Sequence, residues 1–182
     1  MKKSYSPKPK HKYGALTALF VAATLLSHAS AEDVPDVPLT MTVISDDAYG
    51  KTVTKGEYEQ AIDRITRNGR RIPKRFAGQN NLCVAYTKTN EIEKARIACD
   101  AAISSIERRG VRASIGTWYY SAAVHAYQSD LAVALSNRGV LLAAIGDADL
   151  AEQDFVAAIE LKTALTSTIE SNLERLGQLT TS

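Results

Sequence analysis

Apolar residues recur along most of the chain at the three- and four-residue spacing of an amphipathic helix. The stretch EYEQAIDRITRNG shows this spacing, and Asn68-Gly69 and Pro73 end it. NNLCVAYTKT and EIEKARIACDAAISSI follow, joined at Thr89-Asn90, where Asn tolerates the left-handed backbone that a tight turn requires. The pattern predicts an all-α protein.

Both ends of this helical region have their own patterns. Residues 32–44 contain two Pro, three acidic residues and no helical spacing, which predicts an extended leader, interpreted as a spacer rather than as a docking peptide. Ser45 then precedes two Asp, as an N-cap does, and begins the domain predicted over residues 45–182. Near the end, a spacing of four, four and three predicts an amphipathic capping helix over residues 166–180, with an apolar face formed by Leu165, Ile169, Leu173 and Leu176.

One short phrase occurs three times in the helical region. It consists of a turn residue, an apolar or small residue two positions later and Ala five positions later, and its copies begin at Gly56, Asn90 and Gly146. The first two copies are 34 residues apart, and the third follows after 56, which is 34 plus 22. This period predicts stacked helical repeats with one insertion. The repeats cover about residues 42–75, 76–109 and 132–165, and the insertion covers residues 110–131.

A 34-residue helix-turn-helix repeat with these residues resembles the tetratricopeptide repeat (TPR) family. The second unit matches the family's positions 7, 8, 11, 20 and 27 with Leu82, Cys83, Tyr86, Ala95 and Ala102. The third unit matches positions 4, 8, 11, 15, 20, 24 and 27 with Leu135, Gly139, Leu142, Gly146, Ala151, Phe155 and Ala158. Three positions that are usually apolar or aromatic depart from the pattern, at Gln79, Cys99 and Arg138. The resemblance implies a right-handed superhelical array of TPR-like repeats, closed by the capping helix.

The resemblance also implies a partner-binding surface, because the first helix of each repeat lines the concave face in this family. Here that face consists of Asn80, Asn81, Val84, Thr87, Lys88, Ser136, Asn137 and Val140. Asn81 and Asn137 share the sixth position, where Asn in peptide-binding relatives hydrogen-bonds a bound main chain. The alternative is that both Asn are solvated or cap helices.

A second candidate surface lies in the insertion, where Trp118, Tyr119 and Tyr120 follow one another. Aromatic side chains with polar tips are common anchors of protein interfaces. The alternative is that they pack the insertion against the repeats.

Cys83 and Cys99 lie in the two helices of the second unit, on faces that should meet. Counting from the turn at Asn90 places them within about one helical turn of each other in height. They either form a disulfide or are two small buried apolar residues. A bridge across this 16-residue separation would stabilise the fold by about 3 kcal/mol.

The first 31 residues predict a cleaved export signal. They have a basic start, an apolar core of 13 residues and Ala-Ser-Ala before Glu32. That core is shorter than the ~20 residues of a spanning helix, so we expect a periplasmic or secreted protein that is not integral to the membrane after cleavage. Cleavage leaves 17 basic and 20 acidic residues, a net charge of −3, which argues against nucleic-acid binding.

The chemistry of the mature chain favours binding over catalysis. It keeps one His, His125, and has no nucleophile-base pair and no Gly-rich phosphate loop. We therefore predict no catalytic residues, no metal site and no cofactor. We expect a non-catalytic exported TPR protein that serves as a protein-protein interaction scaffold or adaptor. The alternatives are a self-associating structural module, such as a homodimer, and an accessory subunit of an envelope enzyme or assembly complex.

Overall fold

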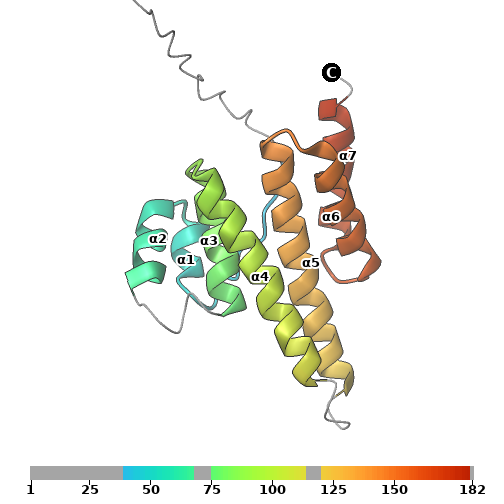
Figure 1. Ribbon diagram of the computed structural model, residues 1–182, viewed down its shortest axis with the longest axis horizontal. Coiled ribbons are helices and arrows are strands. Elements are labelled where there is room, and N and C mark those ends of the chain that lie inside the picture. The colour runs from blue at the N-terminus through green and yellow to red at the C-terminus, as the bar shows by residue number, and fades with distance from the viewer. Residues whose placement is uncertain (1–38, 68–74, 114–119, 181–182) are drawn as a thin grey trace, which may run out of the picture. The chain divides into compact units, whose positions relative to one another are not determined.

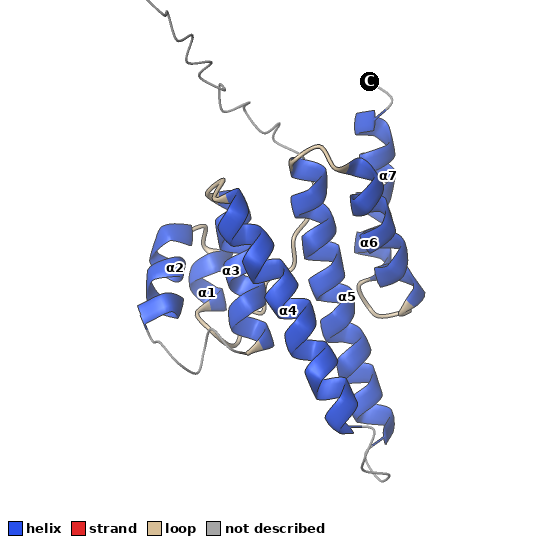
Figure 2. Ribbon diagram, in the orientation of Figure 1, coloured by secondary structure: helices blue, strands red, loops and turns tan. Residues whose placement is uncertain are grey.

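The computed structural model describes residues 39–67, 75–113 and 120–180 (Figure 1). All regular elements in these ranges are helices (Figure 2): α1 Gly50–Thr54, α2 Tyr58–Arg67, α3 Phe76–Lys88, α4 Ile92–Ala113, α5 Tyr120–Ala144, α6 Ala148–Glu160 and α7 Thr166–Thr180. The predicted all-α class is confirmed for the described residues. The predicted signal, residues 1–31, lies outside them.

Each helix packs against the next one in the chain, with the chain turning back between them. The odd-numbered helices also contact one another, α1 with α3, α3 with α5 and α5 with α7. Over the described residues, α4 contacts neither α2 nor α6. The odd-numbered helices therefore gather on one side, which we call the inner face.

The three turns within the helical pairs share one backbone geometry. Gly56, Asn90 and Gly146 are all left-handed, with φ of 79°, 58° and 83°. In each turn the next N–H donates to the carbonyl five residues before it, from Glu57 to Thr52 (3.2 Å), from Glu91 to Tyr86 (2.9 Å) and from Asp147 to Leu142 (2.9 Å). This is the Schellman pattern, which satisfies carbonyls at the helix end. The chain thus repeats its backbone hydrogen bonds where it repeats its sequence.

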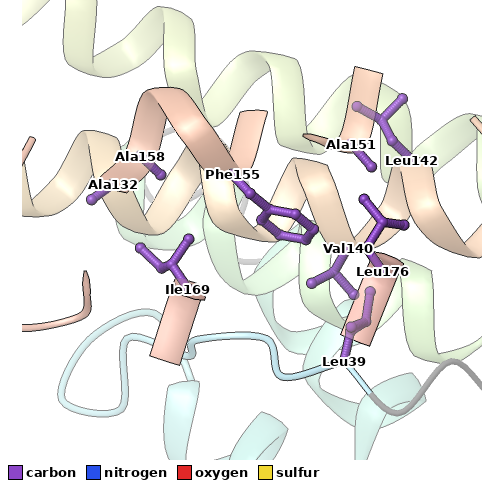
Figure 3. Packing of buried hydrophobic residues seen from close by; sticks show 9 residues of the cluster. All are labelled: Leu39, Ala132, Val140, Leu142, Ala151, Phe155, Ala158, Ile169 and Leu176. Carbon is purple, nitrogen blue, oxygen red and sulfur yellow. The ribbon is translucent and has the colours of Figure 1, made fainter. Parts of the chain in front are cut away.

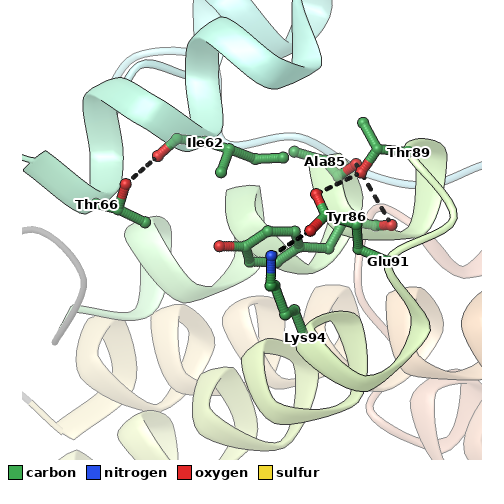
Figure 4. A network of polar contacts seen from close by, with 7 residues as sticks. All are labelled: Ile62, Thr66, Ala85, Tyr86, Thr89, Glu91 and Lys94. Atoms are coloured by element: carbon green, nitrogen blue, oxygen red, sulfur yellow. Dashed lines mark hydrogen bonds and ion pairs between the residues drawn. The ribbon is translucent and has the colours of Figure 1, made fainter.

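Side chains reinforce the turn between α3 and α4 (Figure 4). The Thr89 hydroxyl lies 3.1 Å from the Ala85 carbonyl and 3.2 Å from Glu91 Oε1. Lys94 pairs with Glu91 and lies over the Tyr86 ring, 5.5 Å from its centre. The hydrogen bond from Lys94 lowers the pKa of the Glu91 carboxyl below its ordinary value. These contacts join the end of α3 to the first turn of α4.

The two helices of each pair meet through residues 16 positions apart. In the third pair Gly139 faces Phe155, and a Cβ at Gly139 would lie 2.8 Å from the Phe155 ring. Phe155 is fully buried in the cluster of Figure 3. In the second pair the equivalent residues are Cys83 and Cys99, which form a disulfide with Cα atoms 4.8 Å apart. The prediction that these two Cys form a disulfide is confirmed. The disulfide occupies the positions at which the third pair has Gly139 and Phe155.

The structure shows what fills the predicted insertion and corrects one predicted helix start. Much of the insertion predicted over residues 110–131 is helical, because α4 continues to Ala113 and α5 already begins at Tyr120. Residues 120–131 contain no Gly or Pro that would end a helix. The predicted N-cap at Ser45 is wrong, since α1 begins only at Gly50. Helix α1 begins late because side chains of other helices hold the segment that precedes it.

Candidate functional site

Residues 39–44, which we call the strap, are non-helical and lie against the inner face. Asn side chains from three helices hydrogen-bond the main chain of every second strap residue, namely Thr40, Thr42 and Ile44. The strap is thus docked on the protein's own helices, and the prediction that this part of the leader is a spacer is wrong.

The contacts at Thr40 and Thr42 have the same geometry. The Thr40 N–H donates to Asn172 Oδ1 (2.8 Å), and Asn172 Nδ2 donates to the Thr40 carbonyl (2.8 Å). Likewise the Thr42 N–H donates to Asn137 Oδ1 (2.7 Å), and Asn137 Nδ2 donates to the Thr42 carbonyl (2.8 Å). Each amide therefore pairs with both polar groups of one extended residue, as a neighbouring strand would.

Two neighbouring residues of α3 complete the set. Asn80 Nδ2 donates to the Thr42 carbonyl (3.0 Å), and its Oδ1 accepts from Asn137 Nδ2 (2.8 Å). Asn81 pairs with the N–H (3.0 Å) and carbonyl (3.1 Å) of Ile44. We call Asn80, Asn81, Asn137 and Asn172 the asparagine ladder.

Asn81 also determines where α1 begins. Its Nδ2 lies 3.2 Å from the Asp47 carbonyl and 3.3 Å from the Ala48 carbonyl. The chain then passes through left-handed Ala48 and Tyr49 before α1. At Gly50 a Cβ would lie 1.9 Å from the Ile44 carbonyl oxygen, so the return of the chain requires glycine there. The local N-cap signal at Ser45 therefore gives way to a tertiary contact.

All four ladder residues are fully buried, with 0% of their surface exposed. A buried amide without partners costs about 1–3 kcal/mol, so such a cluster is stable only when its groups are satisfied. Among the described residues, no buried side-chain nitrogen or oxygen lacks a hydrogen-bond partner. The alternative that Asn81 and Asn137 are solvated is therefore wrong.

The strap's side chains add apolar contacts. Leu39 is buried beside Leu176 in the cluster of α5, α6 and α7 (Figure 3). Met41 packs against three clusters, and Val43 packs against the one that contains Val53 and Val84. Thr40, in contrast, is exposed. The main chain of the strap is held by amides, while the odd-numbered side chains and that of Ile44 contact the core.

The structure divides the residues predicted for the concave surface into three groups. Asn80, Asn81 and Asn137 come together in the ladder. Three others are buried, namely Val84, Ser136 and Val140. The Thr87 hydroxyl donates to the Cys83 carbonyl (2.7 Å) of its own helix, and Lys88 is exposed.

The aromatic candidates lie largely outside the described residues. Trp118 and Tyr119 precede the start of α5 and are not described. Tyr120 is the first residue of α5, but its side chain is not described.

Sequence analysis missed one ladder residue, Asn172. Its helix was predicted from the spacing of Leu and Ile residues alone, and that spacing does not indicate that an Asn between them is buried. A signal was present, because counting one 34-residue period on from Asn137 reaches Ser171, its neighbour.

An open hollow of about 320 Å³ lies between α4, α5 and α6. Arg138 lies in its lining and donates to Asp154 from Nε (2.7 Å) and Nη2 (2.8 Å) and to Asp100 from Nη1 (3.0 Å). The hydrogen bonds to Asp154 raise the pKa of Arg138 above its ordinary value. These pairs explain a charged residue at a position that the repeat pattern makes apolar, and they leave Arg138 committed to internal partners.

In the described residues, no three His, Cys, Asp or Glu side chains gather as a group that could hold a metal ion. No helix in the same ranges combines the length and apolar character needed to cross a membrane.

The chain matches no protein-family model, no curated protein and no solved structure.

Proposed function

We propose that this protein is an exported, non-catalytic interaction scaffold of the TPR type, whose inner face holds an extended main chain of a protein partner. The observation that carries the proposal is the asparagine ladder, which pairs with the main chain at residues 40, 42 and 44. The strap occupies the surface as a bound peptide would.

The chemistry of the ladder supports binding of other segments. Its hydrogen bonds go to N–H and carbonyl groups, which every residue except Pro presents in the same way. Recognition of a main chain in this way resembles the addition of a strand to a sheet edge, in which backbone bonds provide affinity. A segment from another protein could make the same bonds if the strap left the ladder.

The arrangement of helices supports the TPR part of the proposal. The three turns share one hydrogen-bond pattern, and the odd-numbered helices contact one another while α4 contacts neither α2 nor α6 in the described residues. Closer packing on one side than on the other is what a curved array requires. A disulfide is compatible with the oxidising compartment that an export signal would lead to.

The test opens the ladder in a chain that starts at Glu32. The double variant Thr40→Pro/Thr42→Pro removes the two N–H groups that donate hydrogen bonds to Asn172 and Asn137. We call it the released variant. We expect it to bind a fluorescent peptide with the strap sequence LTMTVI, measured by anisotropy. Adding Asn137→Ala should weaken that binding by about tenfold or more, because it removes hydrogen bonds to the peptide.

The matched control is Thr40→Ala/Thr42→Ala, which keeps both N–H groups and therefore the docked strap. Circular dichroism establishes that the variants remain helical. If the helical released variant binds no peptide, the ladder serves only the chain's own architecture and the proposed function is wrong.

A further inference from the structure

The strap alternates strictly between two kinds of contact up to Val43. The even residues Thr40 and Thr42 pair their main chain with the ladder. The odd residues direct apolar side chains to the core clusters. An extended chain places successive side chains on opposite faces, so the register of the hydrogen bonds decides which side chains meet the core.

Resting on the proposed function, we infer that the partner of the ladder is an extended protein segment with an apolar side chain at every second position, and that the strap is its built-in competitor. Because the amides fix the register, they also fix which positions of the segment must be apolar. The ladder would then bind any extended segment with apolar side chains at these alternate positions, rather than one particular sequence.

Three apolar clusters along the inner face would receive these side chains. The first surrounds Leu39 and includes Leu176 (Figure 3). Met41 bridges this cluster to those around Leu82 and Val53, and Val43 contacts only the last of these. Leu39 is 5% exposed, so a charged side chain in its place would lose its hydration without gaining a charged partner from the neutral ladder.

The even positions place fewer demands on a partner. Thr40 is exposed, and Thr42 is half-buried. What these positions require is the N–H and carbonyl that Asn172 and Asn137 bond. A partner with Pro at such a position would lose a bond at a buried acceptor, whereas Pro at an odd position would keep the ladder intact.

The strap can compete because it is tethered beside the ladder. A short flexible tether gives an effective concentration on the order of 1 mM, so a peptide with a Kd of about 10 µM would bind the intact protein roughly 100-fold more weakly. Within the described residues, the strap continues into the helices at its carboxyl end, through Ser45. It can therefore peel away from Leu39 inward without unwinding a helix.

The first experiment tests the register on the released variant with two N-methylated LTMTVI peptides. Methylating the amide of the second Thr removes the N–H equivalent to that of Thr42, and we expect binding to weaken by about tenfold or more. Methylating Met, one residue earlier, removes an N–H that the ladder does not use, and binding should stay within about threefold. A peptide with Asp in place of Met should also bind about tenfold more weakly.

The second experiment tests competition. The unmodified peptide should bind the protein with its natural strap, and the Thr40→Ala/Thr42→Ala control, at least about tenfold more weakly than it binds the released variant. A second released variant, Leu39→Ser/Met41→Ser, frees the strap by removing its apolar anchors without adding Pro. It should bind the peptide as tightly as the first one.

The outcomes separate the claims. If both methylated peptides bind the released variant alike, the inferred register is wrong while the proposed function stands. If the natural strap leaves peptide affinity unchanged, the competitor role is wrong. If the helical Thr40→Pro/Thr42→Pro variant binds no peptide, the proposed function fails and this inference fails with it.

Discussion

At the scale of single residues, the ladder depends on a side chain that is donor and acceptor at once. Asn137 accepts from the Thr42 N–H and donates to both the Thr42 carbonyl and Asn80. Neither a carboxylate nor a hydrocarbon of similar size provides both functions. This explains why an amide occupies each of the positions that meet the strap.

Replacing Asn137 by Ala should lower the free energy of unfolding by about 3 kcal/mol, because it leaves the Thr42 N–H without its acceptor and removes two further bonds. Asn137→Asp should cost at least as much, since the carboxylate would face the Thr42 carbonyl and Asn80 Oδ1. Urea denaturation measures both. Thr40→Ala, at an exposed side chain, should change stability by less than about 0.5 kcal/mol. Equal stability of Asn137→Ala and Thr40→Ala would contradict this account.

Gly139 offers a second prediction at this scale. A Cβ there would lie 2.8–3.1 Å from three atoms of the Phe155 ring, so Gly139→Ala should destabilise the protein by about 1–3 kcal/mol through overpacking. Gly177 in α7 is the matched control, because a Cβ there would meet no atom within 4 Å. Gly177→Ala should stabilise by about 0.5–1 kcal/mol through helix propensity. Thermal unfolding of the two variants should shift in opposite directions.

At the scale of helical pairs, different residue types form the contact between positions 16 residues apart. The third pair uses glycine against an aromatic ring, and the second uses a disulfide. In the first pair the equivalent residues are Tyr49 and Ile65, and Tyr49 packs against the cluster that contains Ile65. The disulfide therefore takes the place of a large buried side chain and links α3 to α4 covalently.

Removing that bond should lower stability by about 3 kcal/mol, since it releases the constraint that a 16-residue separation places on the unfolded chain. Urea denaturation with and without reductant measures this change. The variant Cys83→Ala/Cys99→Ala should unfold at the same urea concentration in both conditions. A natural chain that is equally insensitive to reductant would contradict the prediction.

Local pattern was sufficient to predict the helical pairs. The turn at Asn90 and the meeting of Cys83 with Cys99 follow from residues close in sequence, and both occur in the structure. The strap could not be predicted in the same way. Its hydrogen bonds join Thr40 to Asn172 across 132 positions. They use main-chain groups of the strap, which are the same whatever the side chains are, so the strap sequence does not indicate them. The structure of residues 120–131 was left open, because matching repeats locates a break in the period but does not indicate which structure fills it.

At the scale of the whole molecule, the strap links helices that a repeat array would leave connected only through their neighbours. Through Asn81, Asn137 and Asn172 it joins α3, α5 and α7. In a plain array, stability is close to a sum of units and neighbouring interfaces, and end units can open alone. A strap that crosses several pairs opposes such separate opening.

Hydrogen exchange should reveal this coupling. In the natural chain the amides of α7 should exchange through openings nearly as costly as those of α3, because opening α7 breaks its bonds to the strap. In the Thr40→Pro/Thr42→Pro variant, exchange in α7 should accelerate by about tenfold or more while α4, held by the disulfide, changes less. Equal acceleration in α4 and α7 would show that the strap does not couple the pairs.

The partnership between Thr40 and Asn172 also dictates an order of events during biosynthesis. The strap leaves the ribosome before α1 to α7, yet the amide partner of Thr40 belongs to the last of these helices, α7. Until α7 has been made and has packed, the inner face lacks the residue that binds the main chain of Thr40. A nascent chain, or one cut short by a premature stop before α7, would therefore have the strap unbound at Thr40 and the amides of the ladder open to water or to other chains.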